Sequence, residues 1–194
     1  MISGIILAGG KSSRMKFNKA FARLHNQTVI EILVKKFTQF FSETIIISND
    51  PELFTEMGVR VFQDIIPSQG PVSGIHAGLN YANHETVFIC GCDMPFVNLD
   101  MVDYLMSRLG NHDSVVPEIH GHLQPTAAIY NRKCLPVFTE SLQQDHLKLT
   151  WLFREELDAV VVQAQELERF GDVSQMFFNI NDANALEKAR KFAW

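Results

Sequence analysis

Short apolar runs alternate along this chain with segments whose apolar residues recur three and four positions apart. The runs are typical of buried strands, and the spacing in the other segments is typical of helices. We predict strands at residues 2–7, 44–48, 59–62, 86–90, 114–116, 126–130 and 159–163. We predict helices at residues 28–41, 50–57, 71–82, 100–109, 133–143, 149–156 and 183–192. This order indicates an α/β fold with a doubly wound, mostly parallel sheet and helices on both faces.

The length of the chain is consistent with one domain over residues 1–194. With 46% hydrophobic residues, the chain can form one sizeable core but not a second full domain. No apolar stretch approaches the roughly 20 residues that span a bilayer, and we expect no membrane association. Residues 1–4 run directly into the first strand, so we expect no signal peptide. The three cysteines form no Cys-x-x-Cys pair, which predicts reduced thiols in a cytoplasmic protein.

Small residues and then cations follow the first predicted strand. The small residues are Ala8, Gly9 and Gly10, and the cations are Lys11, Arg14, Lys16 and Lys19. Small residues let backbone N–H groups approach a ligand, and the cations favour an anionic one. The whole chain carries a formal charge of −5, so this basic island fits a small phosphate-bearing ligand better than a nucleic acid. The alternative is a strand-to-helix turn with solvated lysines.

This segment does not fit the two commonest phosphate loops. A Walker A motif would need glycine at position 5, where the chain has Ile5, and Gly4 lies one residue away. The Gly-x-Gly-x-x-Gly fingerprint of dinucleotide-binding folds is absent from the sequence.

Ligands of doubly wound sheets bind beyond the carboxyl ends of the strands. This rule selects residues 8–19, 48–49, 63–64 and 92–95. Asp93 follows an apolar strand, and a carboxylate beside a phosphate loop is a candidate ligand for Mg²⁺. An aspartate that closes a turn is the alternative at this position.

The first loop resembles Leu-Ala-Gly-Gly-x-Ser-x-Arg-Met-x-x-x-Lys, the N-terminal motif of the molybdenum cofactor guanylyltransferases within the nucleotidyltransferase superfamily. The matching residues are Leu7, Ala8, Gly9, Gly10, Ser12, Arg14, Met15 and Lys19. Two positions depart from the motif: Lys16 replaces a usual glycine, and Asn18 replaces a common aspartate. The resemblance extends over nearly the whole chain and implies a Rossmann-like nucleotidyltransferase fold.

Further segments match the nucleotide-binding side of that family. Residues 92–96 match its metal-binding motif around Asp93, and residues 70–75 resemble its Gly-Pro-Leu-Ala-Gly-Ile segment. Asn49 and Asp64 align with positions that contact the nucleotide; Asp64 would hold a ribose hydroxyl, or the N1–H and N2 amine of guanine. Two alternatives stay open: Asn49 equally suits a helix N-cap, and Gly74 with Gly78 equally suits helix–sheet packing.

The acceptor side of the family is matched near residue 124 and near the C-terminus. Asn179 and Asn181 resemble its Asn-x-Asn motif, which lies near the metal and the acceptor substrate. Either asparagine equally suits the cap of the last helix. Gln124-Pro125 resembles the acceptor-side Gln-Pro, although Thr126 replaces the usual leucine.

The resemblance implies transfer of GMP from GTP to the terminal phosphate of molybdopterin, with Mg²⁺ held by Asp93 and pyrophosphate released. Its catalytic residues would be Arg14, Lys19 and Asp93. Its nucleotide-binding residues would be Leu7, Ala8, Gly9, Gly10, Lys19, Asn49, Asp64, Gly70, Gly74 and Asp93, and its acceptor-binding residues Gln124, Asn179 and Asn181. The nucleotide part would span about residues 1–95 and the acceptor part about 96–194. Transient contacts with molybdenum-cofactor biosynthesis proteins or molybdoenzyme chaperones would follow.

Two other functions remain open from the sequence. One is a cytidylyl- or sugar-phosphate nucleotidyltransferase of the same fold, although Gly9-Gly10 favours the guanylyl branch, since the cytidylyl branch typically reads Ala-Ala-Gly. The other is a GTP-binding adaptor without turnover, which the departures at Lys16 and Asn18 suggest. Cys90 is expected in the core, and His120 and His122 in a solvated hairpin.

Overall fold

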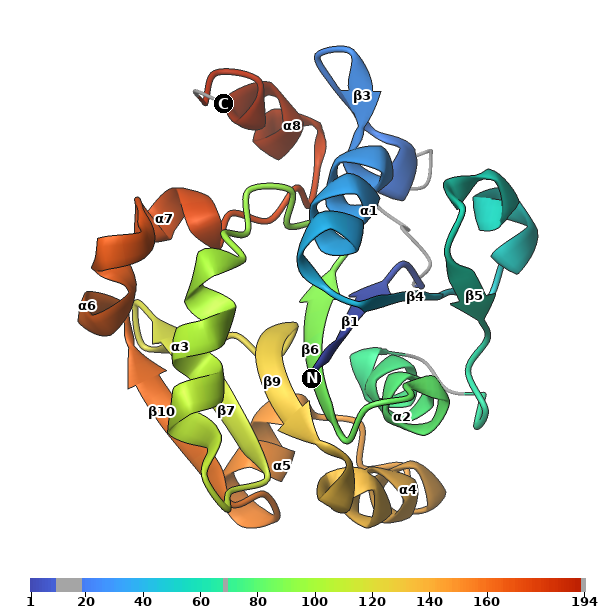
Figure 1. The fold of residues 1–194 in the computed structure, drawn as a ribbon, viewed down its shortest axis with the longest axis vertical. Coiled ribbons are helices and arrows are strands. Elements are labelled where there is room, and N and C mark those ends of the chain that lie inside the picture. Colours follow the sequence, from blue (N-terminus) through green and yellow to red (C-terminus); the bar gives the residue numbers. More distant parts are fainter. Residues whose placement is uncertain (10–18, 68–69, 193–194) are drawn as a thin grey trace.

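The computed structural model describes residues 1–9, 19–67 and 70–192 and contains a central eight-stranded sheet (Figure 1). The strand order is β10-β7-β9-β6-β1-β4-β5, and β8 pairs with β7. The strands are β1 (Ser3–Leu7), β4 (Glu43–Ile47), β5 (Arg60–Phe62), β6 (Thr86–Gly91), β7 (Ser114–Ile119), β8 (His122–Leu123), β9 (Ala127–Asn131) and β10 (Ala159–Gln163). A separate hairpin joins β2 (Arg23–Leu24) to β3 (Gln27–Thr28).

The sheet is mostly parallel, which confirms the predicted fold class. β1 lies at its centre and pairs in parallel with β4 and β6, so that Ile5 stands opposite Ile45 on one side and Ile89 on the other. β4 with β5 and β7 with β10 are also parallel pairs. β9 runs antiparallel to both of its neighbours, β6 and β7. The carboxyl ends of β5, β4, β1 and β6 therefore lie along one edge.

Helices cover both faces of the sheet. The α-helices are α1 (Val29–Phe40), α2 (Pro71–Tyr81), α3 (Asp100–Leu109), α4 (Leu135–Gln143), α5 (Leu149–Glu155), α6 (Ala164–Leu167), α7 (Val173–Met176) and α8 (Ala183–Ala189). The 3₁₀ helices are η1 (Lys19–Phe21), η2 (Pro51–Met57), η3 (Arg132–Cys134) and η4 (Glu168–Phe170). Among the described residues, no helix has the length and apolarity required to cross a membrane.

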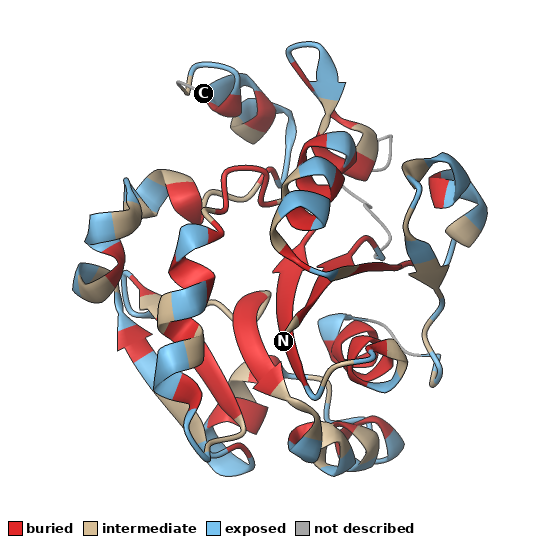
Figure 2. Ribbon diagram, in the orientation of Figure 1, coloured by how far each residue is buried: buried red, intermediate tan, exposed pale blue. Residues whose placement is uncertain are grey.

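Two hydrophobic clusters form the core, one on each face, because successive strand side chains point in opposite directions. In β1, Ile6 packs into the cluster with α1, α3 and α8, whereas Ile5 and Leu7 pack into the cluster with α2, α4 and α5. The central strands are buried throughout, and exposed residues lie on the outer helices and the connecting turns (Figure 2).

Most predicted elements occur within a few residues of their expected bounds. Thr28, the first residue of the predicted helix, is the N-cap of α1, and Glu31 completes a capping box. The segment after Asp50 was predicted as a helix and is the 3₁₀ helix η2, followed by Gly58 at φ 68°. The last helix ends at Ala189 rather than at residue 192. The β2–β3 hairpin and the short helices of residues 164–176 were not predicted, because they are too short for a hydrophobic period.

Gly4 allows α1 to lie close against the central strand. A Cβ atom at this position would lie 2.4 Å from Cδ2 of Phe41 and 2.6 Å from Cδ1 of Phe37. Both rings are buried, and they also pack against Phe88 of β6 with ring centroids 6.0 and 6.1 Å away. The aromatic cluster therefore fills the space that a side chain on Gly4 would take.

We expect Gly4→Ala to lower the free energy of unfolding by about 1–3 kcal/mol, since overpacking a dense core displaces its side chains. Gly9→Ala is the matched control, because no atom of the residues that the structure describes lies within 4 Å of its added Cβ. Urea unfolding of both variants measures the effect. Equal stability of the two variants would show that the Phe37 and Phe41 rings move aside at no cost.

Candidate active site

The carboxyl ends of β1, β4 and β6 are joined by backbone hydrogen bonds beyond the strands themselves. Ala8 N donates to Ile47 O at 2.8 Å, and Cys92 N donates to Leu7 O at 2.9 Å. These bonds hold the start of the first loop beside the segment that carries Asp93. Gly9 is exposed at the end of this part. Gly10, Arg14, Lys11 and Lys16 lie outside the residues that the structure describes.

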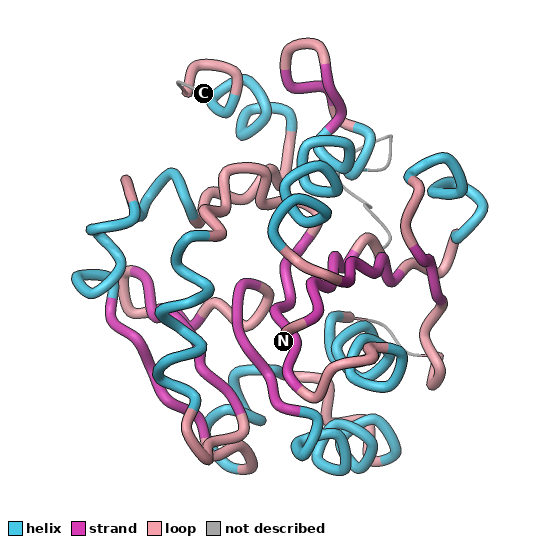
Figure 3. The backbone as a smooth tube through the Cα atoms, in the orientation of Figure 1, coloured by secondary structure: helices cyan, strands magenta, loops and turns pink. Residues whose placement is uncertain are grey.

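Lys19, Asp93 and Asn181 come from three distant parts of the sequence and meet at this edge. The Lys19 Nζ atom lies 3.9 Å from Asp93 Oδ2 and donates a hydrogen bond to Asn181 Oδ1 at 2.8 Å. Ile180 N donates to Asp93 O at 2.8 Å. Figure 3 shows the loop after β6 beside the loop that leads into α8. The structure thus brings together three of the predicted site residues.

Burial raises the pKa of Asp93 above the ordinary value of an aspartate, and the positive charge of Lys19 opposes that rise. The side chain of Asp93 retains 24% of its exposure, so the carboxylate is still open on one side. A Cβ on Gly91 would lie 2.8 Å from Asp93 Oδ1, and glycine at this position therefore leaves the carboxylate its space. The carboxyl group of Asp93 is thus partly buried, with the positive charge of Lys19 beside it.

This carboxylate fits Mg²⁺ better than a metal held entirely by protein. No group of three or more His, Cys, Asp or Glu side chains suited to a metal occurs among the described residues. Mg²⁺ is often held by one or two carboxylates, with substrate phosphates and water as the other ligands. Asp93 can supply the single carboxylate of such a site.

The two asparagines of the C-terminal motif have different partners. Asp182 caps α8 by accepting from Ala185 N at 2.8 Å, so the alternative that an asparagine caps this helix is wrong. Asn181 is exposed and accepts from Lys19, whereas the half-buried Asn179 donates to Phe177 O at 3.1 Å. Within the described residues, Asn181 is the member of the pair that contacts a predicted catalytic residue.

A second cluster lies at the carboxyl ends of β4 and β5. Asn49 Nδ2 donates to Asp64 Oδ2 at 2.9 Å, and Asp64 N donates to Asn49 Oδ1 at 3.2 Å. The alternative role of Asn49 as a helix N-cap is wrong, because Asp50 occupies that position before η2. Both ends of the Asn49 amide are bound to Asp64, so Asn49 fixes the position of the carboxylate.

Two further partners belong to this cluster: Gln63, which the strand-end rule selected together with Asp64, and Ser73, which the sequence analysis did not single out. Ser73, on α2, donates to Asp64 Oδ2 at 3.0 Å and lies 3.0 Å from Gly70 O. Gln63 Nε2 donates to Asn49 O at 3.1 Å. Only the place of Gln63 at a strand end marks it in the sequence, and Ser73 occupies the alanine position of the Gly-Pro-Leu-Ala-Gly-Ile motif.

The glycines of α2 allow close packing of the helix on the sheet. A Cβ on Gly74 would lie 3.1 Å from Leu7 Cδ2, and a Cβ on Gly78 would lie 2.9 Å from Ile5 Cγ2. The packing role that the spacing allowed is therefore confirmed, and a nucleotide contact of Gly74 stays a prediction. Gly70 precedes the helix at φ 121°, which favours glycine.

Gln124 and its neighbours lie against the end of β6. Gly91 N donates to Thr126 O at 2.8 Å, two residues before Asp93. The half-buried Gln124 donates from Nε2 to His122 O at 3.1 Å. This places the predicted acceptor segment beside the strand that delivers Asp93.

Cys90 and His120 are the remaining candidates from the sequence analysis. Cys90 is fully buried, as predicted, and all three cysteines are free. Burial raises the pKa of Cys92 to about 12, which keeps this thiol protonated. His120 is exposed at φ 52°, and its Nε2 atom lies 3.4 Å from Ser174 Oγ.

The position of a phosphate loop, at the end of β1, lies at the carboxyl edge of a mostly parallel sheet. Lys19, Asp93 and Asn181 meet at the same edge. This is the arrangement of a nucleotidyltransferase. Residues 4–160 match the model of the MobA-like NTP transferase domain. The chain belongs to this family.

Curated relatives and solved structures agree with this assignment. A probable molybdenum cofactor guanylyltransferase of Clostridium perfringens (strain SM101 / Type A) is 39% identical over 187 residues, which cover 95% of this chain and 94% of the relative. The molybdenum cofactor guanylyltransferase of Syntrophotalea carbinolica is 32% identical over 97% of this chain and 90% of its own length.

The crystal structure of molybdopterin-guanine dinucleotide biosynthesis protein A from Archaeoglobus fulgidus superposes with a TM-score of 0.86. It shares 23% identity, and the match covers 97% of both chains. The CMP:2-keto-3-deoxy-manno-octonic acid synthetase complexed with CTP superposes with a TM-score of 0.74 at 12% identity, over 97% of this chain and 96% of that one. These two likenesses confirm the fold.

We expect Asp93→Asn to raise the Tm of the protein without nucleotide at pH 7. The raised pKa means that the folded state binds the Asp93 proton more tightly than the unfolded state does, so the ionised carboxylate costs stability above the ordinary carboxyl pKa. This cost falls as the pH drops through the raised pKa, and the difference in Tm should shrink towards pH 4. Thermal unfolding from pH 4 to 8 measures it. A variant less stable than the parent at pH 7 would contradict the analysis.

Proposed function

We propose that this protein transfers GMP from GTP to the terminal phosphate of molybdopterin, forming the guanine dinucleotide cofactor and releasing pyrophosphate. Membership of the family and the names of relatives at 32–39% identity support this activity. The observation that carries it is the meeting of Lys19, Asp93 and Asn181 at the carboxyl ends of β1 and β6. The site therefore combines a cation for phosphate with a carboxylate for Mg²⁺.

The triphosphate would lie along the end of β1. Backbone groups of Leu7, Ala8 and Gly9, together with Gly10, would approach it, because small residues leave the backbone accessible. Lys19 and Arg14 would place positive charge beside the α-phosphate and the leaving pyrophosphate. Asn181 accepts a hydrogen bond from Lys19 and holds the ammonium group at the site.

The reaction is a displacement at the α-phosphorus. An oxygen of the acceptor phosphate forms the new P–O bond, and the bond to the bridging oxygen of the β-phosphate breaks. Asp93 would hold Mg²⁺, which neutralises charge on the phosphates when it is bound. The attacking phosphate is already anionic, so positioning and charge compensation are the main contributions of the protein.

The nucleoside would lie over the cluster of Asn49, Asp64 and Ser73, near the start of α2 at Gly70 and Gly74. Asp64 Oδ2 already accepts from Asn49 and Ser73, and among the described residues no donor reaches its Oδ1 atom. Oδ1 is therefore the oxygen that would accept from the ribose or from guanine.

The acceptor would lie on the other side of Asp93. We propose that the nucleotide part extends to about residue 95 and that residues 96–194 supply Gln124, Asn179 and Asn181 to the acceptor. The contact of Lys19 with Asn181 would then join the two parts. A cytoplasmic enzyme that hands its product to cofactor-biosynthesis proteins or molybdoenzyme chaperones follows from this function.

Thermal shift with GTP, CTP, ATP and UTP, each with and without Mg²⁺, tests the nucleotide. We expect a selective stabilisation by GTP that needs Mg²⁺, and formation of the dinucleotide cofactor when molybdopterin is added. Selectivity for CTP would favour the cytidylyl reaction, and a GTP shift without turnover would favour an adaptor. Either result would overturn the proposal.

We expect Lys19→Ala to reduce the transfer rate by about 10²-fold or more, since removal of one preorganised contact to the transition state typically lowers the rate by this factor. Asn181→Ala should cost less, because Lys19 keeps its charge. Lys35→Ala, an exposed lysine of α1, is the control and should leave the rate unchanged. A similar small effect at all three positions would mean that Lys19 is only a solvated cation.

We expect Asp64→Asn to raise KM for GTP by about tenfold or more with little change in kcat, because a hydrogen bond to a charged group stabilises binding by about 1.5–3 kcal/mol. Parallel measurements with ITP and with 3′-deoxy-GTP identify the group that is bound. Loss of the preference for GTP over ITP assigns Asp64 to the guanine amine, and loss of the preference over 3′-deoxy-GTP assigns it to the ribose. An unchanged KM would remove Asp64 from the site.

A further inference from the structure

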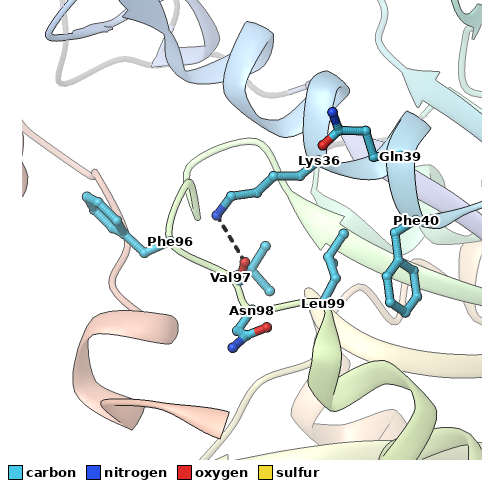
Figure 4. Close-up of a pocket in the computed structure, with 7 residues that line it drawn as sticks. All are labelled: Lys36, Gln39, Phe40, Phe96, Val97, Asn98 and Leu99. Carbon is cyan, nitrogen blue, oxygen red and sulfur yellow. Dashed lines mark hydrogen bonds between the residues drawn. The ribbon is translucent and has the colours of Figure 1, made fainter. Parts of the chain in front are cut away.

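A cavity of about 420 Å³ lies between α1 and the segment that follows Asp93. Figure 4 shows Phe40 and Gln39 of α1 on one side and Phe96 to Leu99 on the other, with Lys36 between them. The lysine points towards the backbone of the opposite segment. The lining of this cavity therefore includes the contact between α1 and the loop after β6.

Lys36 binds this loop through its ammonium group. Its Nζ atom donates to Pro95 O at 2.8 Å and to Val97 O at 3.2 Å. Burial lowers the pKa of Lys36, and no carboxylate of the described residues forms an ion pair with it. A methionine would fill the same space at a lower desolvation cost. What the ammonium group of Lys36 adds over a methionine is therefore the pair of hydrogen bonds to the two carbonyl oxygens.

The loop that Lys36 binds carries Asp93 two residues before Pro95. On its other side, Ile180 N donates to Asp93 O at 2.8 Å. Within the loop, Met94 N donates to Gly91 O at 3.2 Å, and Val97 N donates to Met94 O at 3.3 Å. The loop is thus held between α1 and the segment before α8, and Asp93 lies within it.

We propose that Lys36 is a positioning residue for Asp93. In this role it would contact neither nucleotide nor metal. Its bonds to Pro95 O and Val97 O would fix the backbone from which the carboxylate of Asp93 reaches the ligand. The inference rests on the proposed function, in which Asp93 holds Mg²⁺. Groups that orient a metal ligand from outside typically affect metal affinity by 10- to 100-fold when they are removed.

Lys36→Met tests the role, and the exposed neighbour Lys35→Met is the matched control. We expect Lys36→Met to raise the Mg²⁺ concentration for half-maximal transfer by about tenfold, with KM for GTP at saturating Mg²⁺ within about twofold of the parent. The Mg²⁺ dependence of the GTP-induced thermal shift should move by the same factor. Lys36→Arg, which keeps charged donors, should recover most of the Mg²⁺ response.

A second neutral variant, Lys36→Gln, provides the same measurement if Lys36→Met does not fold. A lower Tm with an unchanged Mg²⁺ midpoint in either variant would reduce Lys36 to a structural role and overturn the inference alone. Absence of any Mg²⁺-dependent GTP response in the parent protein would overturn the proposed function and the inference with it. Asp93→Asn should lose the Mg²⁺-dependent GTP response altogether and is the reference for complete loss of the metal site.

Discussion

The parallel pairing of β1 between β4 and β6 is the constraint on which the rest of the structure depends. It places the carboxyl ends of three strands at one edge, and backbone bonds from Ala8 and Cys92 extend the alignment beyond the strands. Close packing secures the strand from both faces, with the rings of Phe37 and Phe41 over Gly4 and the helix α2 against Ile5 and Leu7. Loops that leave this edge start from fixed points, and this fixes the geometry of the site.

The candidate site contains charged side chains whose burial costs stability. Asp93 keeps a carboxylate in a half-buried place where its pKa is raised, and Lys19 compensates it from 3.9 Å, beyond hydrogen-bonding distance. A tighter ion pair would occupy the oxygens that a metal needs. Lys36 repeats this pattern: its ammonium group is half-buried, and its hydrogen bonds to the described residues go to main-chain oxygens of the same loop. Asp93 lies within the segment from Gly91 to Val97 and Lys36 binds that segment. Buried charges concentrated in this way are typical of functional sites.

The two ligand-facing clusters differ in how their side chains are held. Asp64 is fixed by side-chain donors from Asn49 and Ser73, which lie on different elements. Asp93 is fixed through its backbone, by Ile180 and by the neighbouring turn. The first arrangement orients one carboxylate oxygen and leaves the other open, as recognition of a nucleoside group requires. In the second, no side chain of the described residues donates a hydrogen bond to the Asp93 carboxyl group.

The alternation of apolar runs and helical segments determined the fold class, because burial on both faces requires continuous apolar strands and amphipathic helices. The strand-end positions of Asp93 and Asp64 also followed from the sequence. Tertiary structure alone decided that Asn181 rather than Asn179 meets Lys19, that Asn49 binds Asp64 instead of capping a helix, and that Ser73 and Lys36 support the site. These contacts join residues up to 162 positions apart. Local sequence specifies which backbone a residue occupies, whereas the packing of distant elements determines which partner its side chain finds.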